Sequence, residues 1–170
     1  MDVAESVRRL TAADAAAFRE LRLRALKEHA DAFTSSFEED VSQPVGAVEQ
    51  RLAGESGNVF WGAYVEGTLR GMVGLAREAR AKNRHKGHVV AMYVAPEFGR
   101  RGLGKALLQA VIDYARDERQ LEQLVLTVTR TNQAASELYR AAGFRTFGVE
   151  PRALKVGSDY FDKEHMILFL

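Results

Sequence analysis

The sequence predicts a single α/β (α+β) domain in which strands and helices surround one core, and three observations support this. Strand and helix patterns follow one another along all 170 residues without a linker, a repeat or a low-complexity tract. The run Leu124–Val128 is continuously apolar, as in a strand that is buried on both faces. An apolar strand ending near Val94 leads through a glycine-rich basic turn directly into a helix. We therefore expect one domain over residues 1–170.

The composition is that of a protein with one core and no strong overall charge. Apolar residues make up 46% of the chain, and 24 basic against 23 acidic side chains leave a net charge of +1. Such a balance gives no global attraction to nucleic acid or to an acidic membrane. The chain has no cysteine, which excludes disulfides and a cysteine nucleophile and suits a reducing compartment. With no leader pattern and no apolar run of about 18 residues, we expect a cytoplasmic protein.

The first half of the chain contains a strand, two helices and a hairpin. Thr11-x-x-Asp14 is typical of a helix start, and Phe18, Leu21 and Leu26 continue an amphipathic helix. Pro44 favours the start of a second helix, which glycines then end. The expected elements are a strand near 7–10, a helix from about 11 to 29, a polar loop over 31–43, a helix after Pro44, and strands over 59–65 and 69–77.

The second half contains the patterns with the clearest periodicity. From Leu103 to Ala115, apolar residues recur at helical spacing and predict a helix with one fully buried face. Gly143 is a natural residue to follow a helix that begins near Asn132. The expected elements are strands over 88–94 and 123–129, helices from 103 and over 132–142, and two final strands within 144–149 and 160–170.

The turn at residues 99–105 is suited to bind a phosphate group. Glycines let backbone N–H groups approach an anion, and the first turn of the following helix adds unpaired donors and its dipole. A P-loop is incomplete here, because Ala106 stands where Ser or Thr should bind magnesium. The dinucleotide pattern G-x-G-x-x-G also fails, because it ends on Leu107. What remains is R-x-G-x-G/A after a strand ending in M-Y-V-x-P.

A second pattern follows later in the chain. It reads Leu126-x-Val128-x-x-x-Asn132-x-x-Ala135-x-x-Leu138-Tyr139-x-x-x-Gly143-Phe144. Together the two patterns resemble the acetyl-CoA site of the GNAT N-acetyltransferase superfamily, and nearly the whole chain takes part in the resemblance. It implies a mixed, largely antiparallel sheet of about seven strands flanked by about four helices, with a V-shaped split between strands 88–94 and 123–129. The family's first motif usually begins with Gln or Arg, where this chain has Gly99.

The resemblance also implies an activity and a set of site residues. It implies direct transfer of the acetyl group of acetyl-CoA to a primary amine, on a small molecule or a peptide, with release of CoA and without an acyl-enzyme intermediate. Helical patterning alone makes Tyr139 a core residue, whereas the resemblance places it near the thioester sulfur as the acid that protonates the leaving thiolate. The implied cofactor-binding residues are Met92, Tyr93, Val94, Arg100, Arg101, Gly102, Leu103, Gly104, Lys105, Asn132 and Tyr139.

The general base and the acceptor are left open by the sequence. Glu38 lies in a loop that tends to line the acceptor pocket in this family, and His88 has a suitable unperturbed pKa of about 6.5. A water relay without a dedicated base is a third alternative. The loop with Phe33, Phe37, Glu38 and Glu39 suggests a cationic acceptor with an apolar part. His85 and His88 lack the spacing of a metal site.

Three further interpretations remain beside the enzyme. The first is a non-catalytic acyl-CoA-binding sensor on the same scaffold. The second is a nucleotide-binding protein that uses Gly99–Lys105 as a degenerate P-loop, without the magnesium-binding hydroxyl. The third is compatible with any of these functions and concerns the oligomeric state: the apolar C-terminal run Met166–Leu170 could pair with another chain and form a homodimer.

Overall fold

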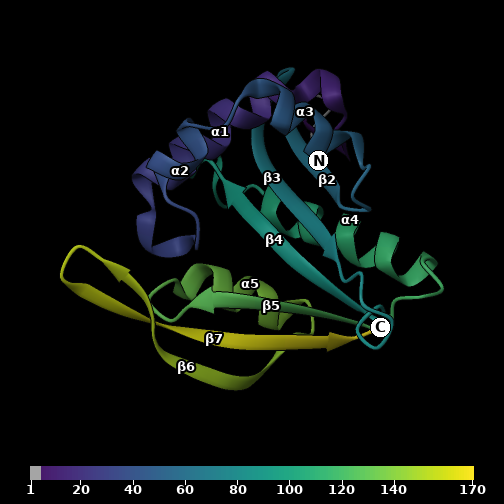
Figure 1. Cartoon of the computed structure of the whole chain (residues 1–170), viewed down its shortest axis with the longest axis vertical. Coiled ribbons are helices and arrows are strands. Elements are labelled where there is room, and N and C mark those ends of the chain that lie inside the picture. Colours follow the sequence, from purple (N-terminus) through teal and green to yellow (C-terminus); the bar gives the residue numbers. More distant parts are fainter. Residues whose placement is uncertain (1–4) are drawn as a thin grey trace.

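The computed structural model describes residues 5–170, in which seven strands form one open sheet (Figure 1). The strand order is β1-β2-β3-β4-β5-β7-β6. The pair β4 and β5 is parallel and the other neighbouring pairs are antiparallel, which confirms the mixed, largely antiparallel sheet. The strands are β1 (Glu5–Arg9), β2 (Val59–Val65), β3 (Thr68–Arg77), β4 (Lys86–Val94), β5 (Gln123–Thr129), β6 (Arg145–Val156) and β7 (Asp159–Phe169).

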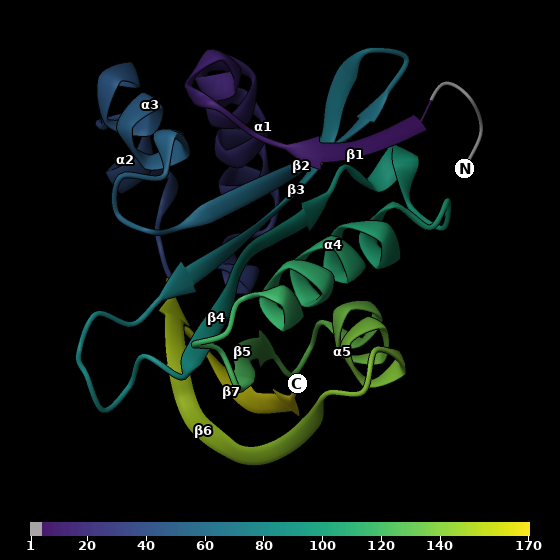
Figure 2. The same cartoon turned by 90° about the vertical axis from the view of Figure 1, so that its right-hand side faces the viewer.

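Helices cover both faces of the sheet. They are α1 (Ala15–Glu28), α2 (Phe37–Val41), α3 (Val45–Ala53), α4 (Leu103–Asp117) and α5 (Gln133–Ala141). Figure 2 shows α1, α2 and α3 on one side of the strands and α4 and α5 on the other. The short α2 was not predicted and lies within the segment that we expected to be a polar loop. Its start is held by Ser36 and Glu39, each of which accepts a hydrogen bond from the backbone N–H of the other.

Each face of the sheet has its own apolar core. In β2, Trp61 is buried among the residues of α4, whereas its neighbour Phe60 packs edge-on against Phe18 of α1. This follows from the alternation of side chains along a strand. Of the predicted apolar positions of α4, four are buried and three are partly buried; the buried ones are Leu103, Leu107, Val111 and Ala115. Within residues 5–170, no helix is long and apolar enough to cross a bilayer.

The centre of the sheet splits where β4 and β5 separate. The two strands pair only over Lys86–His88 and Gln123–Val125, and Figure 1 shows them diverging from that end. β4 also carries a bulge: two residues separate Val90 from Tyr93, whereas one separates their partners Gly74 and Met72 in β3, and Ala91 has a φ of +55°. These features confirm the predicted V-shaped split. Beyond its pairing with Gln123–Val125, the edge of β4 that faces β5 is free to bind another group.

The C-terminal strand is not at an edge of the sheet. β7 pairs with β5 on one side and with β6 on the other, so that Met166 lies between Leu126 and Thr146. The edges are β1 and β6. Met166 and Ile167 therefore offer no free edge, whereas β6 begins at Arg145, opposite Ile167, and a homodimer through the end of β7 stays a prediction.

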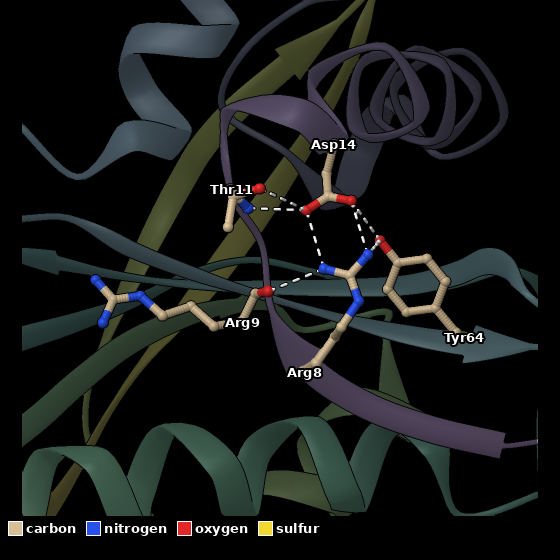
Figure 3. Close-up of polar contacts among 5 residues, drawn as sticks. All are labelled: Arg8, Arg9, Thr11, Asp14 and Tyr64. Carbon is tan, nitrogen blue, oxygen red and sulfur yellow. Dashed lines mark hydrogen bonds and ion pairs between the residues drawn. The ribbon is translucent and has the colours of Figure 1, made fainter.

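A polar cluster joins β1 to the start of α1 (Figure 3). Both oxygens of Asp14 accept hydrogen bonds from the Arg8 guanidinium, at 3.0 and 2.8 Å. The backbone N–H of Thr11 and the hydroxyl of Tyr64 also donate to this carboxylate, at 2.8 and 3.0 Å. Arg8 above all, then Thr11 and Tyr64, hold the pKa of Asp14 well below its usual value of 3.8.

We expect Asp14→Asn to lower the free energy of unfolding at pH 7 by about 1–2 kcal/mol, as for loss of a helix-capping carboxylate. Because the pKa of Asp14 is lowered by folding, its contribution is complete above pH 3.8 and is lost as the pH falls further. Denaturant unfolding at pH 7 and pH 3 measures this. The difference between wild type and variant should shrink at pH 3, and a constant difference would contradict the role of the charge.

Candidate active site

A cavity of about 620 Å³, which we call the cofactor cavity, lies where β4 ends and where α4 and α5 begin. It is lined by the end of β4, by the glycine-rich turn and by the residue that starts α5. The structure therefore brings most of the predicted cofactor-binding residues together. Those that line it are Met92, Tyr93, Val94, Arg100, Gly102, Leu103, Gly104, Lys105 and Asn132.

The start of α4 provides a cradle for an anion. Gly102 caps the helix with a φ of +85°, and Arg100 has a φ of +58°. The first hydrogen bond within the helix runs from the N–H of Ala106 to the oxygen of Gly102. The N–H groups of residues 103–105 therefore have no acceptor within the helix, and the dipole favours a negative charge there. The geometry and the charge fit a diphosphate.

Arg101 does not reach this cavity, although its neighbour Arg100 does. Its guanidinium forms an ion pair with Glu5 of β1, whose side chain is 5% exposed. It also lies 5.7 Å from the centre of the Phe98 ring. The side chain thus connects the turn to the first strand. The side chains of these adjacent arginines therefore lie in different surroundings.

We expect Arg101→Ala to lower the melting temperature and to leave the affinity for acetyl-CoA within about 3-fold, since its ion pair is structural. The matched variant Arg100→Ala should keep its melting temperature and bind acetyl-CoA more weakly, because Arg100 lines the cofactor cavity. Thermal unfolding and calorimetric titration with acetyl-CoA check both variants. Weaker binding in Arg101→Ala at an unchanged melting temperature would contradict this assignment.

A second cavity, of about 280 Å³, occupies the split between β4 and β5. We call it the acceptor cavity. The bulge of β4 forms one wall and Tyr139 of α5 another. It shares Phe33, Met92 and Asn132 with the cofactor cavity. The two cavities therefore meet beside the bulge, and a group bound in one can reach a group bound in the other.

Tyr139 is a core residue that also borders a cavity, and its role as the acid stays a prediction. Its side chain is in the core, with 6% of the residue exposed and its ring packed edge-on against Phe144. It also lines the acceptor cavity. Burial raises the pKa of its phenol above the usual 10.0. The hydroxyl therefore stays protonated at neutral pH, and burial makes it a weaker acid than an exposed phenol.

The sequence profile of the Acetyltransferase (GNAT) family matches residues 22–144. The chain belongs to this family. It is 33% identical over 120 residues to the N-alpha-acetyltransferase RimI of Mycobacterium tuberculosis, a match that covers 69% of this chain and 72% of RimI. As a GNAT protein it is an acetyltransferase that transfers the acetyl group of acetyl-CoA to an amine.

Solved GNAT structures have the same fold. An acetyltransferase of Streptococcus pneumoniae superposes with a TM-score of 0.90 at 25% identity, over 98% of this chain and 99% of that chain. The structure of yncA from Salmonella typhimurium, which contains acetyl-CoA, has a TM-score of 0.80 at 23% identity, over 98% of this chain and 94% of that chain.

The two candidates for a general base line neither the cofactor cavity nor the acceptor cavity. Glu38 is exposed on α2. His88 lies at the paired end of β4 and its Nε2 is 2.9 Å from Oε1 of Glu78. In the part of the chain that the structure describes, no group of three or more metal-binding side chains is found. The titratable residues His29 and Asp31, which the sequence did not single out, do line the cofactor cavity.

The carboxylates of the α2 segment do not line the acceptor cavity either. Glu39 caps α2, and Asp40 forms an ion pair with Arg22 of α1. The acceptor cavity is lined instead by the basic residues Arg22, Arg51 and Lys163. The suggestion of a cationic acceptor therefore has no support in the structure. Arg51 and Lys163 were missed because nothing in their local sequence distinguishes them from surface residues of a helix and a strand.

Proposed function

We propose that the acceptor is a primary amine that reacts where the two cavities meet. The observation that carries this proposal is the shared wall at Met92 and Asn132, next to the bulge of β4 and within the cavity that Tyr139 lines. The N–H groups at the start of α4 would bind the diphosphate of acetyl-CoA, and the free edge of β4 would bind its pantetheine arm. With acetyl-CoA bound in this way, the thioester would lie at the mouth of the acceptor cavity.

The residues around this point can assist each step of a direct transfer. Backbone N–H groups of Met92–Val94 would donate to the carbonyl oxygen as negative charge develops on it. The amine nitrogen forms a bond to the acetyl carbon, and the carbon–sulfur bond breaks. The phenol of Tyr139 would then give its proton to the leaving sulfur. Asn132 accepts a hydrogen bond from the N–H of Ala135 and keeps its amide donors for the pantetheine arm.

The proton of the acceptor ammonium needs a separate route. Glu38 and His88 stay predictions for this role, but neither lines a cavity. A positioned general base contributes about 10²–10⁴-fold to the rate. If Glu38→Gln and His88→Gln each lower kcat by much less than this, water removes the ammonium proton.

Release of the CoA thiol in the presence of amines tests this function. The protein has no cysteine, so a colorimetric thiol reagent has no background from the chain. We expect release that depends on both acetyl-CoA and a primary amine. If acetyl-CoA binds but no amine causes release of the CoA thiol, the non-catalytic sensor is favoured. If magnesium-ATP binds and acetyl-CoA does not, the nucleotide-binding alternative is favoured. Because the chain is similar to the N-alpha-acetyltransferase RimI, the amines tested should include a peptide with a free α-amine.

A further inference from the structure

The acceptor cavity is lined by three basic side chains and, among the described residues that form its wall, by no carboxylate. Arg22 comes from α1, Arg51 from α3 and Lys163 from β7. These three elements lie far apart in the sequence and meet only in the folded chain. The charge of this cavity therefore indicates what kind of acceptor it binds.

One of the three charges is already compensated. Arg22 is 9% exposed and forms an ion pair with Asp40 of α2. Its guanidinium also lies 3.4 Å from the hydroxyl of Ser35. Arg22 thus holds α2 against α1, and its charge is not available to a ligand.

Arg51 and Lys163 are compensated only weakly, because Asp40 and Glu150 lie near them without forming an ion pair with them. Within residues 5–170, neither has a carboxylate oxygen within 4.0 Å. Lys163 is 8% exposed, and its Nζ donates one hydrogen bond to the hydroxyl of Thr34, at 2.9 Å. Glu150, opposite it on β6, lies 3.0 Å from His165 instead. Arg51 lies over the ring of Phe60, at 4.9 Å.

Such an arrangement is costly unless an anion completes it. Burial lowers the pKa of Lys163, and burial together with the nearby charge of Arg22 lowers the pKa of Arg51. Both shifts mean that the folded protein disfavours these charges in its unliganded form. A carboxylate in the cavity would stabilise both positive charges and accept their remaining hydrogen bonds.

We propose that the acceptor is a free amino acid, whose carboxylate is bound by Arg51 and Lys163 while its amine points to the shared wall at Met92. This rests on the proposed function. The volume of about 280 Å³ suits a small molecule rather than several residues of a peptide. A neighbouring cavity of about 290 Å³ shares Arg22 and Arg51 and is lined by Phe18, Leu23 and Val48, among others. It gives an apolar amino-acid side chain room between α1 and α3.

Matched acceptors test the proposal. The thiol-release assay would compare free leucine and phenylalanine with their decarboxylated amines, isoamylamine and phenethylamine, with their amides, and with spermidine. Hydrogen bonds to charged groups predict that kcat/KM of at least one amino acid exceeds that of its decarboxylated amine by about 10- to 100-fold. Thermal shifts of the CoA-saturated protein with the same compounds give a readout without turnover, and the amino acid should stabilise more.

Variants connect the preference to the two residues. Arg51→Gln and Lys163→Met should each raise the KM of the amino acid by about 10-fold or more, with little change for the decarboxylated amine. Lys163→Arg keeps the charge and should keep part of the preference. Arg116 is an exposed residue of α4, and Arg116→Gln is the control. It should change neither the KM of the amino acid nor that of the decarboxylated amine. If the substituted proteins lose stability, the proposal is still tested by comparing kcat/KM of the wild-type protein for the amino acid and for its decarboxylated amine.

Several outcomes would overturn the proposal. Equal kcat/KM for the amino acid and its amine or amide would show that no carboxylate is recognised. An equal fall of kcat for all acceptors in Lys163→Met would show that Lys163 acts in the chemistry instead. An acidic peptide that reacts better than every free amino acid would indicate a protein substrate. Failure of the proposed function is distinct from these results, because then acetyl-CoA would not bind or no amine would release thiol.

Discussion

Tyr139→Phe is expected to lower kcat by about 10²–10⁴-fold and to leave the affinity for acetyl-CoA nearly unchanged, because only the proton donor is removed. The ring remains, so the edge-on contact with Phe144 and the burial of the side chain are retained. Single-turnover kinetics and calorimetric titration with acetyl-CoA measure the two quantities. Since burial raises the pKa of this phenol, wild-type kcat should not fall from its deprotonation below pH 10.

Tyr114→Phe is the matched control for this prediction. Tyr114 lies on α4 with its ring 5.3 Å from that of Trp61, and it lines neither cavity. It should keep full activity. A kcat for Tyr139→Phe that equals that of the control would assign Tyr139 to the core alone and would require another donor for the leaving thiolate.

Gly104→Val is expected to weaken acetyl-CoA binding by about 10²-fold. A Cβ at Gly104 would lie 3.3 Å from Cδ2 of Leu138 and 3.9 Å from Cγ2 of Val94, which line the same cavity, so we expect the two further methyl groups to take up space at the cradle. There they would separate the diphosphate from the N–H groups of α4. Hydrogen bonds to charged groups are worth about 1.5–3 kcal/mol each, and losing one or two accounts for the expected change.

Gly46→Val controls for the cost of placing valine in a helix. Gly46 lies in α3, and a Cβ there would have no atom within 4 Å. Calorimetric titration of both variants separates the effects. Equal dissociation constants for Gly104→Val, Gly46→Val and the wild type would mean that the diphosphate does not bind at the start of α4.

Most elements could be predicted because their signals are local. The apolar spacing of α4 and the apolar run of β5 each report burial directly, and the motif around the start of α4 follows from backbone geometry that only glycine adopts easily. The short α2 was missed although its capping box, Ser36-x-x-Glu39, is visible in the sequence. Its signal was obscured because the segment is polar and shorter than a typical helix.

The site was less predictable where it depends on tertiary contacts. Arg100 and Arg101 are equivalent in sequence, yet Glu5 of a distant strand binds only the second. The bulge at Ala91 has no local signal, since alanine does not favour a positive φ. Arg51 and Lys163 lie on different elements and come together only when α3 and β7 border the same cavity. Charge in the acceptor cavity is thus a property of the fold and not of any motif.

A crystal structure of the protein with CoA is the most direct test of the central claim, that the two cavities form one reaction site at the split of the sheet. The diphosphate should accept hydrogen bonds from the N–H groups of residues 103–105. The thiol should lie beside the bulge of β4, facing Tyr139 and the acceptor cavity. A diphosphate bound elsewhere, or a thiol outside the split between β4 and β5, would contradict this assignment.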